Sequence, residues 1–213
     1  MKRRAVWVAT LGLIAATASS AHSQDASQLD CFGQDNERRI AGCTALIEAG
    51  RMPSSQLAGI YAQRALAHSL KGDYGTAIQD YDVAIQMQPY FAVALNNRAW
   101  AYFRWGKAAI GLPDVEESLR LDPTAAHSLD TRAHIRQVQG DPKGALSDYT
   151  KAMYYGGSEM TKLYQCGLTE AGLYDGQIDG VWRRELQGAM EKCVVNTTCD
   201  PLPADEHCRP ATS

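Results

Sequence analysis

Small and large apolar residues alternate at helical spacing through the middle of the chain. In the segment YAQRALAHSLKGDYGTAIQDYDVAIQMQP, Ala65 precedes a break at Gly72, and Ala77, Tyr81 and Ala84 follow the break at intervals of three or four residues. Such intervals place side chains on one face of a helix. Small residues on that face let two helices approach closely, the aromatic ring fills the space beside them, and the final proline ends the second helix. The pattern therefore predicts two packed helices joined by a turn at Gly72.

Four kinds of position in this unit recur at one constant interval along the chain. They are a small residue, a turn glycine, a large residue and a helix-ending residue: Ala65, Ala99 and Ala133; Gly72, Gly106 and Gly140; Tyr81, Val115 and Tyr149; Pro89, Pro123 and Gly157. The unit resembles the tetratricopeptide repeat, a helix-turn-helix of about 34 residues. The resemblance covers units 58–91, 92–125 and 126–159. It implies an all-α fold in which helical hairpins stack into a right-handed solenoid.

The second unit and the segment before the first differ from this pattern. In the second unit, Gly111 and Pro113 fall inside the second helix. Because proline costs about 3 kcal/mol in a helix interior, we expect that helix to start late, near Pro113, or to be kinked. Before the first unit, residues 36–49 predict one amphipathic helix that ends at Gly50. With the rest of segment 24–57, it would form a half repeat that caps the exposed face of the solenoid.

The first 23 residues have the order of a secretory signal peptide. Basic residues 2–4 precede an apolar run at 5–18, and small residues follow up to position 23. The run is too short for a bilayer span of about 20 residues, although a retained membrane anchor is the alternative. We therefore expect a periplasmic or secreted protein with no membrane insertion after cleavage.

Composition argues against several classes of partner and chemistry. Without the signal, 18 of the 21 basic residues remain against 24 acidic ones, a formal charge of −6, which disfavours nucleic acid and anionic membranes as partners. The chain has no G-x-S-x-G elbow and no phosphate-binding loop, so we expect no catalytic residue, no cofactor and no metal site. Four carboxylates fall on helix faces that are expected to be solvated: Asp80, Asp82, Glu116 and Glu117.

Six cysteines follow the signal, and an even number in an exported chain favours disulfide bonds. Their clustering along the chain favours three local pairs: Cys31–Cys43, Cys166–Cys193 and Cys199–Cys208. A zinc site is the competing interpretation, but the chain has no C-x-x-C motif, and His207 is the one histidine near the cysteines.

The resemblance also implies where a partner would bind. In tetratricopeptide arrays the first helices line a concave face that typically holds a peptide or a partner's helix. The implied inward positions are Gln63, Leu66, Asn96, Asn97, Trp100, Arg104, His127, Asp130 and His134. Trp100 between Asn97 and Arg104 is the strongest candidate, because asparagine amides can hold a peptide backbone while the indole adds apolar contact. Packing of Trp100 between helices is the open alternative. The two histidines are seven residues apart, too far for a metal-binding i, i+4 pair, so we expect both at the surface or in the groove.

The repeat phase stops at Glu159, and the turn-rich stretch GLYDGQIDGVW follows at 172–182. Its Asp-Gly pairs predict tight turns between helices at about 160–171 and 183–193. Read as an EF-hand calcium loop, the stretch would have Leu186 at the position that requires a bidentate glutamate.

This stretch resembles the small three-helix peptidoglycan-binding domain of cell-wall proteins. The matching positions are Tyr174, Gly176, Asp179, Gly180 and Trp182, while Arg183 and Leu186 depart from the family pattern. The resemblance implies that the element at 160–195 recognises peptidoglycan. Alternatively, the element is a disulfide-stapled cap, held by Cys166–Cys193, on the last helix of the solenoid. Residues 196–213 are expected to form an extended tail closed by Cys199–Cys208.

Together these features predict a non-enzymatic, exported adaptor that binds a protein or peptide in its groove and is located at peptidoglycan by its C-terminal element. A pure interaction scaffold, whose C-terminal element only caps the solenoid, is the first alternative. An accessory subunit of an enzyme that processes the cell wall is the second.

Overall fold

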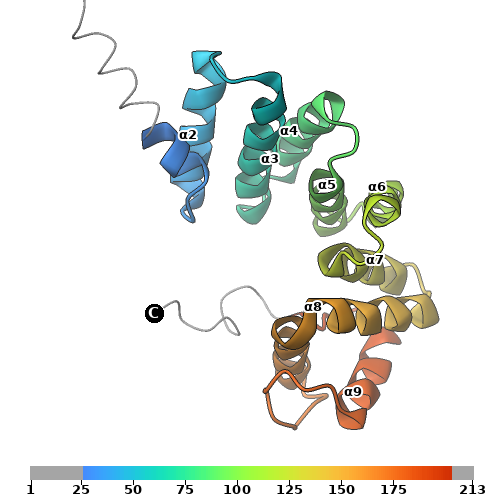
Figure 1. The fold of residues 1–213 in the computed structure, drawn as a ribbon. Coiled ribbons are helices and arrows are strands. Elements are labelled where there is room, and N and C mark those ends of the chain that lie inside the picture. The colour runs from blue at the N-terminus through green and yellow to red at the C-terminus, as the bar shows by residue number, and fades with distance from the viewer. Residues whose placement is uncertain (1–25, 203–213) are drawn as a thin grey trace, which may run out of the picture.

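The structure is a computed structural model that describes residues 26–202. This part of the chain contains helices and no strand. After a helical segment at 26–31, the helices are α2 (Asn36–Ala49), α3 (Ser54–Leu70), α4 (Tyr74–Met87), α5 (Ala92–Arg104), α6 (Ala108–Leu121), α7 (Ala126–Val138), α8 (Pro142–Glu170) and α9 (Arg184–Val194). They stack into a curved array in which α5 and α7 lie on the inner side and α6 on the outer side (Figure 1). The expected signal peptide at 1–23 and the end of the expected tail lie outside the described residues.

Consecutive helices pack as hairpins, as the repeat predicts. The pairs are α3 with α4, α5 with α6, and α7 with α8. The turn in each pair carries a glycine in the left-handed region: φ is 81° at Gly72, 75° at Gly106 and 79° at Gly140. Glycine takes this conformation without steric penalty. The prediction of an all-α solenoid of helical hairpins is confirmed.

Helix α6 begins at Ala108, before Pro113, so the expected late start near Pro113 is wrong. A Cβ atom on Gly111 would lie 2.7 Å from the carbonyl oxygen of Ala99 on α5, so the two helices meet where only glycine fits. Gly111 lies one repeat after Ala77 and one repeat before Ala145, and it occupies the same small-residue position. Pro113 removes a single bond to the carbonyl of Ala109, and both residues are exposed, so water can bind that carbonyl.

A repeated ion pair joins the two helices of each unit. Each arginine donates two hydrogen bonds to one carboxylate at 2.7–2.8 Å: Arg64 to Asp80, Arg98 to Asp114 and Arg132 to Asp148. The partners are 16 residues apart, and the pair recurs once in every repeat. The expectation that Asp80 is solvated is therefore wrong, since Asp80 is buried against Arg64.

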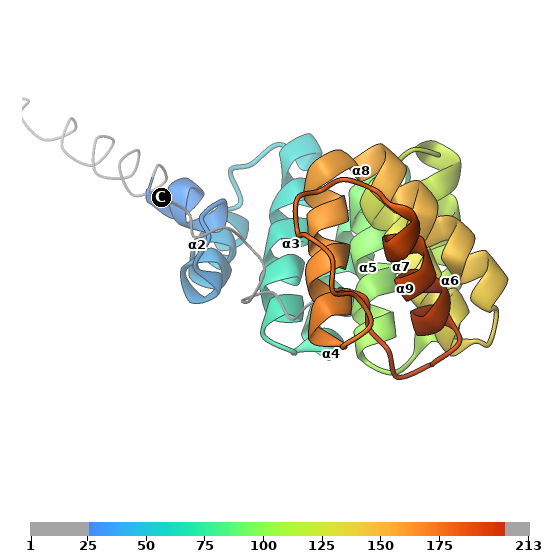
Figure 2. The ribbon, with the colours of Figure 1, turned by 90° about the horizontal axis from the view of Figure 1, so that it is seen from below.

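The repeat phase does not stop at Glu159. Helix α8 is kinked at Gly157, whose φ of 65° and ψ of −153° are accessible to glycine and not to other residues. After the kink, Tyr164 and Gly167 lie one repeat beyond Asp130 and Ala133 and are buried like them. The second half of α8 is therefore the first helix of another hairpin, with α9 packed beside it (Figure 2).

The disulfides agree with one of the three expected pairs. Cys31 and Cys43 are bonded, which fastens the helical segment at 26–31 to α2. Cys193 bonds to Cys199, so the pairings Cys166–Cys193 and Cys199–Cys208 are wrong. The chain turns back directly after α9 and brings the Cα atoms of Cys193 and Cys199 to 5.4 Å. Cys166 is also disulfide-bonded.

Candidate functional site

Residues of α3, α4 and α5 line a pocket of about 110 Å³. Eight residues line it: Leu66, Ser69, Leu70, Tyr74, Tyr81, Asn97, Trp100 and Arg104. Four of them, Leu66, Asn97, Trp100 and Arg104, are predicted groove residues. Trp100 takes part in both of the roles left open by the sequence, because it lines the pocket and also stacks on Phe103 with ring centroids 5.1 Å apart.

The polar groups of this pocket can each donate a hydrogen bond. Asn97 Oδ1 already accepts a hydrogen bond from Asn96 Nδ2 at 3.2 Å, which leaves the Asn97 amide nitrogen to face other groups. The guanidinium carbon of Arg104 lies 5.7 Å from the ring centroid of Trp100. Among the described residues, the buried hydroxyls of Tyr81 and Ser69 have no partner in hydrogen-bonding geometry. Burial raises the pKa of Tyr81, and the neighbouring Asn97 amide opposes part of that rise.

Sequence reasoning missed half of the pocket. Ser69 and Leu70 lie three and four residues after Leu66, so they share its helix face, and this spacing could have identified them. The predicted residues Gln63 and His127 do not line the pocket, and Asn96 is buried beside Asn97.

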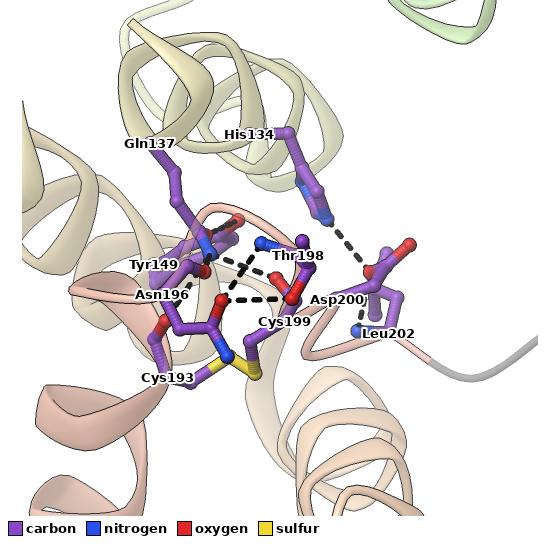
Figure 3. The surroundings of a disulfide bond; sticks show 9 residues. All are labelled: His134, Gln137, Tyr149, Cys193, Asn196, Thr198, Cys199, Asp200 and Leu202. Atoms are coloured by element: carbon purple, nitrogen blue, oxygen red, sulfur yellow. Dashed lines mark hydrogen bonds and ion pairs between the residues drawn. A yellow bond between two sulfur atoms is a disulfide. The ribbon is translucent and has the colours of Figure 1, made fainter. Parts of the chain in front are cut away.

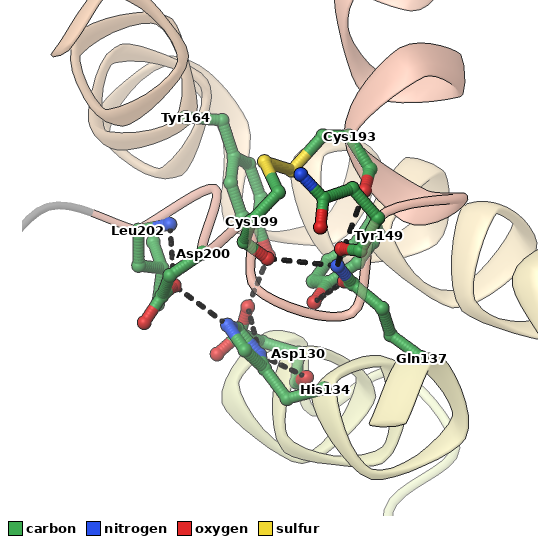
Figure 4. Close-up of polar contacts among 10 residues, drawn as sticks. Asp130, His134, Gln137, Tyr149, Tyr164, Cys193, Cys199, Asp200 and Leu202 are labelled. Carbon is green, nitrogen blue, oxygen red and sulfur yellow. Dashed lines mark hydrogen bonds and ion pairs between the residues drawn. A yellow bond between two sulfur atoms is a disulfide. The ribbon is translucent and has the colours of Figure 1, made fainter. Parts of the chain in front are cut away.

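The inner face of α7 is covered by residues 195–202, which we call the C-terminal strap. Asp200 Oδ1 of the strap lies 3.0 Å from His134 Nε2, and the other ring nitrogen of His134 lies 2.9 Å from the carbonyl oxygen of Asp130 (Figure 4). His134 is 3% exposed and Asp130 is 5% exposed. The prediction that these two residues face an open groove is wrong, because the strap packs over them.

Gln137 holds the strap from the next turn of α7. Its Nε2 donates to the carbonyls of Cys193, Asn196 and Cys199 at 3.2, 2.8 and 2.7 Å (Figure 3). Its Oε1 accepts from the Tyr149 hydroxyl at 2.9 Å. The Cys193–Cys199 disulfide closes the same loop. No local pattern marks Gln137, since these contacts span 56 to 62 residues of sequence.

The charges under the strap form a buried cluster. Burial lowers the pKa of His134, but Asp130 and Asp200 outweigh that effect and raise it to about 9. Burial raises the pKa of Asp130, whose carboxylate accepts a hydrogen bond from Tyr164. The ring of His134 meets those of Trp100 and Tyr149 edge-on at centroid distances of 5.3 and 5.1 Å. The cluster therefore links the pocket wall to the strap.

The connection at 171–183 is held by Gln165, a completely buried residue of α8. Gln165 Oε1 accepts from the Gly180 backbone N–H at 2.8 Å, and Asp179 pairs with Arg183 at 2.7 Å. Tyr174 is buried and donates to the Gln177 carbonyl at 3.2 Å. Tyr174, Asp179 and Gly180, which belong to the expected peptidoglycan-binding set, therefore make hydrogen bonds that hold the connection in its conformation.

The remaining two members of that set, Gly176 and Trp182, are both exposed. A Cβ atom on Gly176 would overlap the hydroxyl of Tyr174, so the ring of Tyr174 requires glycine there. Trp182 is 47% exposed. Of the set, Trp182 is the side chain most available to a ligand.

Neither a metal-binding cluster nor a membrane-spanning helix is found in the part of the chain that the structure describes. Between residues 26 and 202, no three histidine, cysteine or acidic side chains are grouped so that they could hold a metal ion. None of the helices described has the length and apolar character needed to cross a bilayer.

Comparison with known proteins identifies relatives that share part of this chain. No protein-family model matches. The chain is 27% identical to RNA polymerase II-associated protein 3 of Xenopus tropicalis over 59% of its length, and 32% identical to the Hsp70-Hsp90 organizing protein of Triticum aestivum over 57%. It is 34% identical to tetratricopeptide repeat protein 36 of Bos taurus over 40%. These matches span 19%, 17% and 47% of the relatives.

The relatives agree with the resemblance to the tetratricopeptide repeat and not with the second resemblance. They give no support to the resemblance with the peptidoglycan-binding domain. Several carry the tetratricopeptide repeat in their names, including small glutamine-rich tetratricopeptide repeat-containing protein 2 of Saccharomyces cerevisiae, which is 29% identical over 42% of this chain. The fold and these similarities together support the tetratricopeptide repeat family for this chain.

Proposed function

We propose that this protein is a non-enzymatic adaptor that binds an extended segment of a protein partner on the inner face of α3 and α5. The observation that carries the proposal is the pocket around Trp100, where apolar walls surround donor groups that have no acceptor among the described residues. Aromatic and arginine side chains that line a pocket are the residues that most often dominate binding free energy.

The relatives support the same class of function. One of them is named for organizing Hsp70 and Hsp90, which is an interaction between proteins. For the present protein we propose the same class of activity, which is binding to another protein, and we do not propose Hsp70 or Hsp90 as its partners. The strap occupies the inner face of α7, so the partner would lie toward α3 and α5.

Selection from a random peptide library displayed on phage tests this proposal with the full mature chain. We expect enriched peptides to bind the wild-type protein and to lose at least tenfold in affinity for Trp100→Ala, with the helical circular dichroism of the variant unchanged. Failure to enrich any peptide, or equal binding to the two proteins, would contradict the proposal.

We further propose that the protein is exported. Two disulfides lie within residues 26–202, and Cys166 forms another disulfide bond. Stable disulfides are rare where glutathione and thioredoxin keep thiols reduced. Mass spectrometry of the protein from the source organism should find an N-terminus after residue 21 or 23 and oxidised cysteines. An intact Met1 and free thiols would contradict export.

Attachment to peptidoglycan is a second candidate function of the C-terminal hairpin. It is favoured by an exposed apolar group on the connection, formed by Ile178, Val181 and Trp182, each 47–49% exposed. Such a group is suited to contact a ligand. Sedimentation with purified sacculi should then carry the wild-type protein into the pellet and leave Trp182→Ala in the supernatant. If both remain soluble, the hairpin acts as a cap.

A further inference from the structure

Two hydroxyl groups in the pocket between α3, α4 and α5 are buried and lack a partner among the described residues. They are Tyr81 Oη and Ser69 Oγ. The side chain of Tyr81 is fully buried in the core, so water cannot solvate its hydroxyl freely. A buried hydroxyl without a hydrogen bond costs free energy, which a ligand could recover by accepting that bond.

The unpaired hydrogen-bonding groups of this pocket can all donate. Tyr81 and Ser69 each offer an O–H, and Asn97 offers N–H groups because its oxygen is already bonded to Asn96. Arg104 adds a positive charge at the same wall, and among residues 26–202 none of those that line the pocket is acidic. Several hydrogen-bond donors beside one guanidinium favour a negatively charged ligand with several acceptor atoms. A carboxylate has both properties.

Size and wall chemistry narrow the ligand further. A volume of about 110 Å³ is below the roughly 300–1,000 Å³ of pockets that enclose a whole small molecule, so this pocket suits a single side chain. Leu66, Leu70, Tyr74 and Trp100 form apolar walls around the donors. Such walls suit a carboxylate carried on methylene groups, whereas the carboxylate at a chain terminus is attached directly to the backbone.

We propose that this pocket binds the side chain of a glutamate within an extended peptide. The methylene groups lie against Trp100 and Leu66, and the carboxylate accepts hydrogen bonds from Tyr81, Ser69 and Asn97 and pairs with Arg104. This inference rests on the proposed binding of a peptide on the inner face of α3 and α5, and it adds the residue that the peptide must contain.

Titration with designed peptides tests the ligand class. The probe is the acetylated and amidated heptapeptide Gly-Ser-Leu-Glu-Leu-Ser-Gly, followed through the Trp100 indole N–H signal in spectra of the ¹⁵N-labelled mature chain. We expect saturable binding of this peptide and at least tenfold weaker binding of its glutamine analogue. Equal binding of the two would overturn the inference. A third peptide, Gly-Ser-Leu-Gln-Leu-Ser-Gly with a free C-terminus, should bind no better than the glutamine analogue, and tighter binding would assign the pocket to a terminal carboxylate.

Removing a single hydroxyl gives a matched pair of variants. Tyr81→Phe keeps the ring and loses a group that has no partner in the described structure, so we expect an unchanged or higher melting temperature and a three- to tenfold loss of affinity for the glutamate peptide. Tyr149→Phe loses the hydrogen bond to Gln137 outside the pocket, so we expect a lower melting temperature and unchanged affinity. Wild-type affinity in Tyr81→Phe would contradict the inference.

Different results would contradict the adaptor function and the glutamate pocket. If library peptides require Trp100 but the glutamate and glutamine peptides bind equally, the adaptor function stands and the glutamate pocket is wrong. If no peptide of either kind binds, both are wrong.

Discussion

The repeated arginine and aspartate pairs show how residue type and position act together at the scale of single side chains. The helical pattern of apolar residues places Asp80 away from the apolar face and predicts that its side chain faces solvent. The structure instead bonds it to Arg64 across the hairpin. The signal was available, because the arginines at 64, 98 and 132 and the aspartates at 80, 114 and 148 repeat in the same phase as the alanines and glycines. Charged residues that recur at a repeat interval are thus evidence of pairing.

Asp148 provides a direct test of these pairs. It is 1% exposed and accepts from both Arg132 and Arg136, so Asp148→Asn leaves two arginines with weaker partners. Breaking a buried ion pair costs about 3–5 kcal/mol, and we expect the free energy of unfolding in urea to fall by about 3 kcal/mol. Asp82→Asn is the control, because its half-exposed pair with Arg98 should contribute less than about 1 kcal/mol. Equal losses in the two variants would show that burial does not set the strength of these pairs.

At the scale of the element, close contact between helices decides which residues a helix can contain. Glycine and proline at 111 and 113 argue against a helix when propensity is considered alone, yet α6 passes through both. The contact between α6 and Ala99 on α5 requires the missing side chain at Gly111. Tertiary packing therefore outweighs intrinsic propensity here. The same reasoning explains Gly157, whose conformation allows α8 to turn and begin the last hairpin.

Alanine substitution at two helical glycines separates packing from propensity. Gly111→Ala places a Cβ atom 2.7 Å from the Ala99 carbonyl oxygen and 3.1 Å from its Cα, so α5 and α6 must move apart. Overpacking costs about 1–3 kcal/mol, and we expect a net loss of about 2 kcal/mol in thermal or urea denaturation. At Gly188 in α9 no atom lies within 4 Å of an added Cβ, so Gly188→Ala should stabilise by up to about 1 kcal/mol. Stabilisation by Gly111→Ala would contradict the close approach.

At the scale of the whole molecule, the sequence predicts the repeated helical hairpins but not the contacts between segments that are far apart in the chain. The repeat phase predicted the hairpins, and inward positions on the first helices predicted half of the pocket around Trp100. The strap was missed because its contacts join residues that share no local pattern: His134 meets Asp200 across 66 residues, and Gln137 meets the loop after α9. Two of the three expected cysteine pairs are wrong because the chain turns back directly after α9, so that Cys193 meets Cys199, at a sequence separation of 6.

The strap is expected to depend on its disulfide. Cys193→Ser combined with Cys199→Ser removes a closed loop of sequence separation six, which contributes about 2 kcal/mol by the entropy of loop closure. We expect the free energy of unfolding to fall by about that amount and amide exchange to accelerate at residues 195–202. Exchange in α3 and α4 should stay unchanged, and it serves as the internal control. Strap exchange at the wild-type rate would show that Gln137 and Asp200 hold the strap without the disulfide.

The buried cluster makes attachment of the strap dependent on pH. The pKa of His134 is raised from about 6.5 to about 9, so its interactions with Asp130 and Asp200 stabilise the fold fully below about pH 6.5 and are lost as the pH rises through 9. The net shift corresponds to about 3 kcal/mol, which is what remains of the attraction to the two carboxylates after the opposing cost of burial. The hydroxyls of Tyr149 and Tyr164 have pKa values well above 10 and remain neutral over this range.

Asp200→Asn isolates the contribution of the strap, because Asp130 is common to both proteins. We expect the variant to be less stable than the wild type by about 1–2 kcal/mol in urea denaturation at pH 6–7, where His134 is charged in the folded protein. The difference should shrink toward zero by pH 10, where the wild-type imidazole has lost its proton. Since Asp200→Asn removes one carboxylate from the cluster, the variant should also reach its high-pH stability at a lower pH than the wild type. A difference that is constant from pH 6 to 10 would show that Asp200 holds the strap as a neutral hydrogen-bond acceptor, and that charge on His134 plays no part.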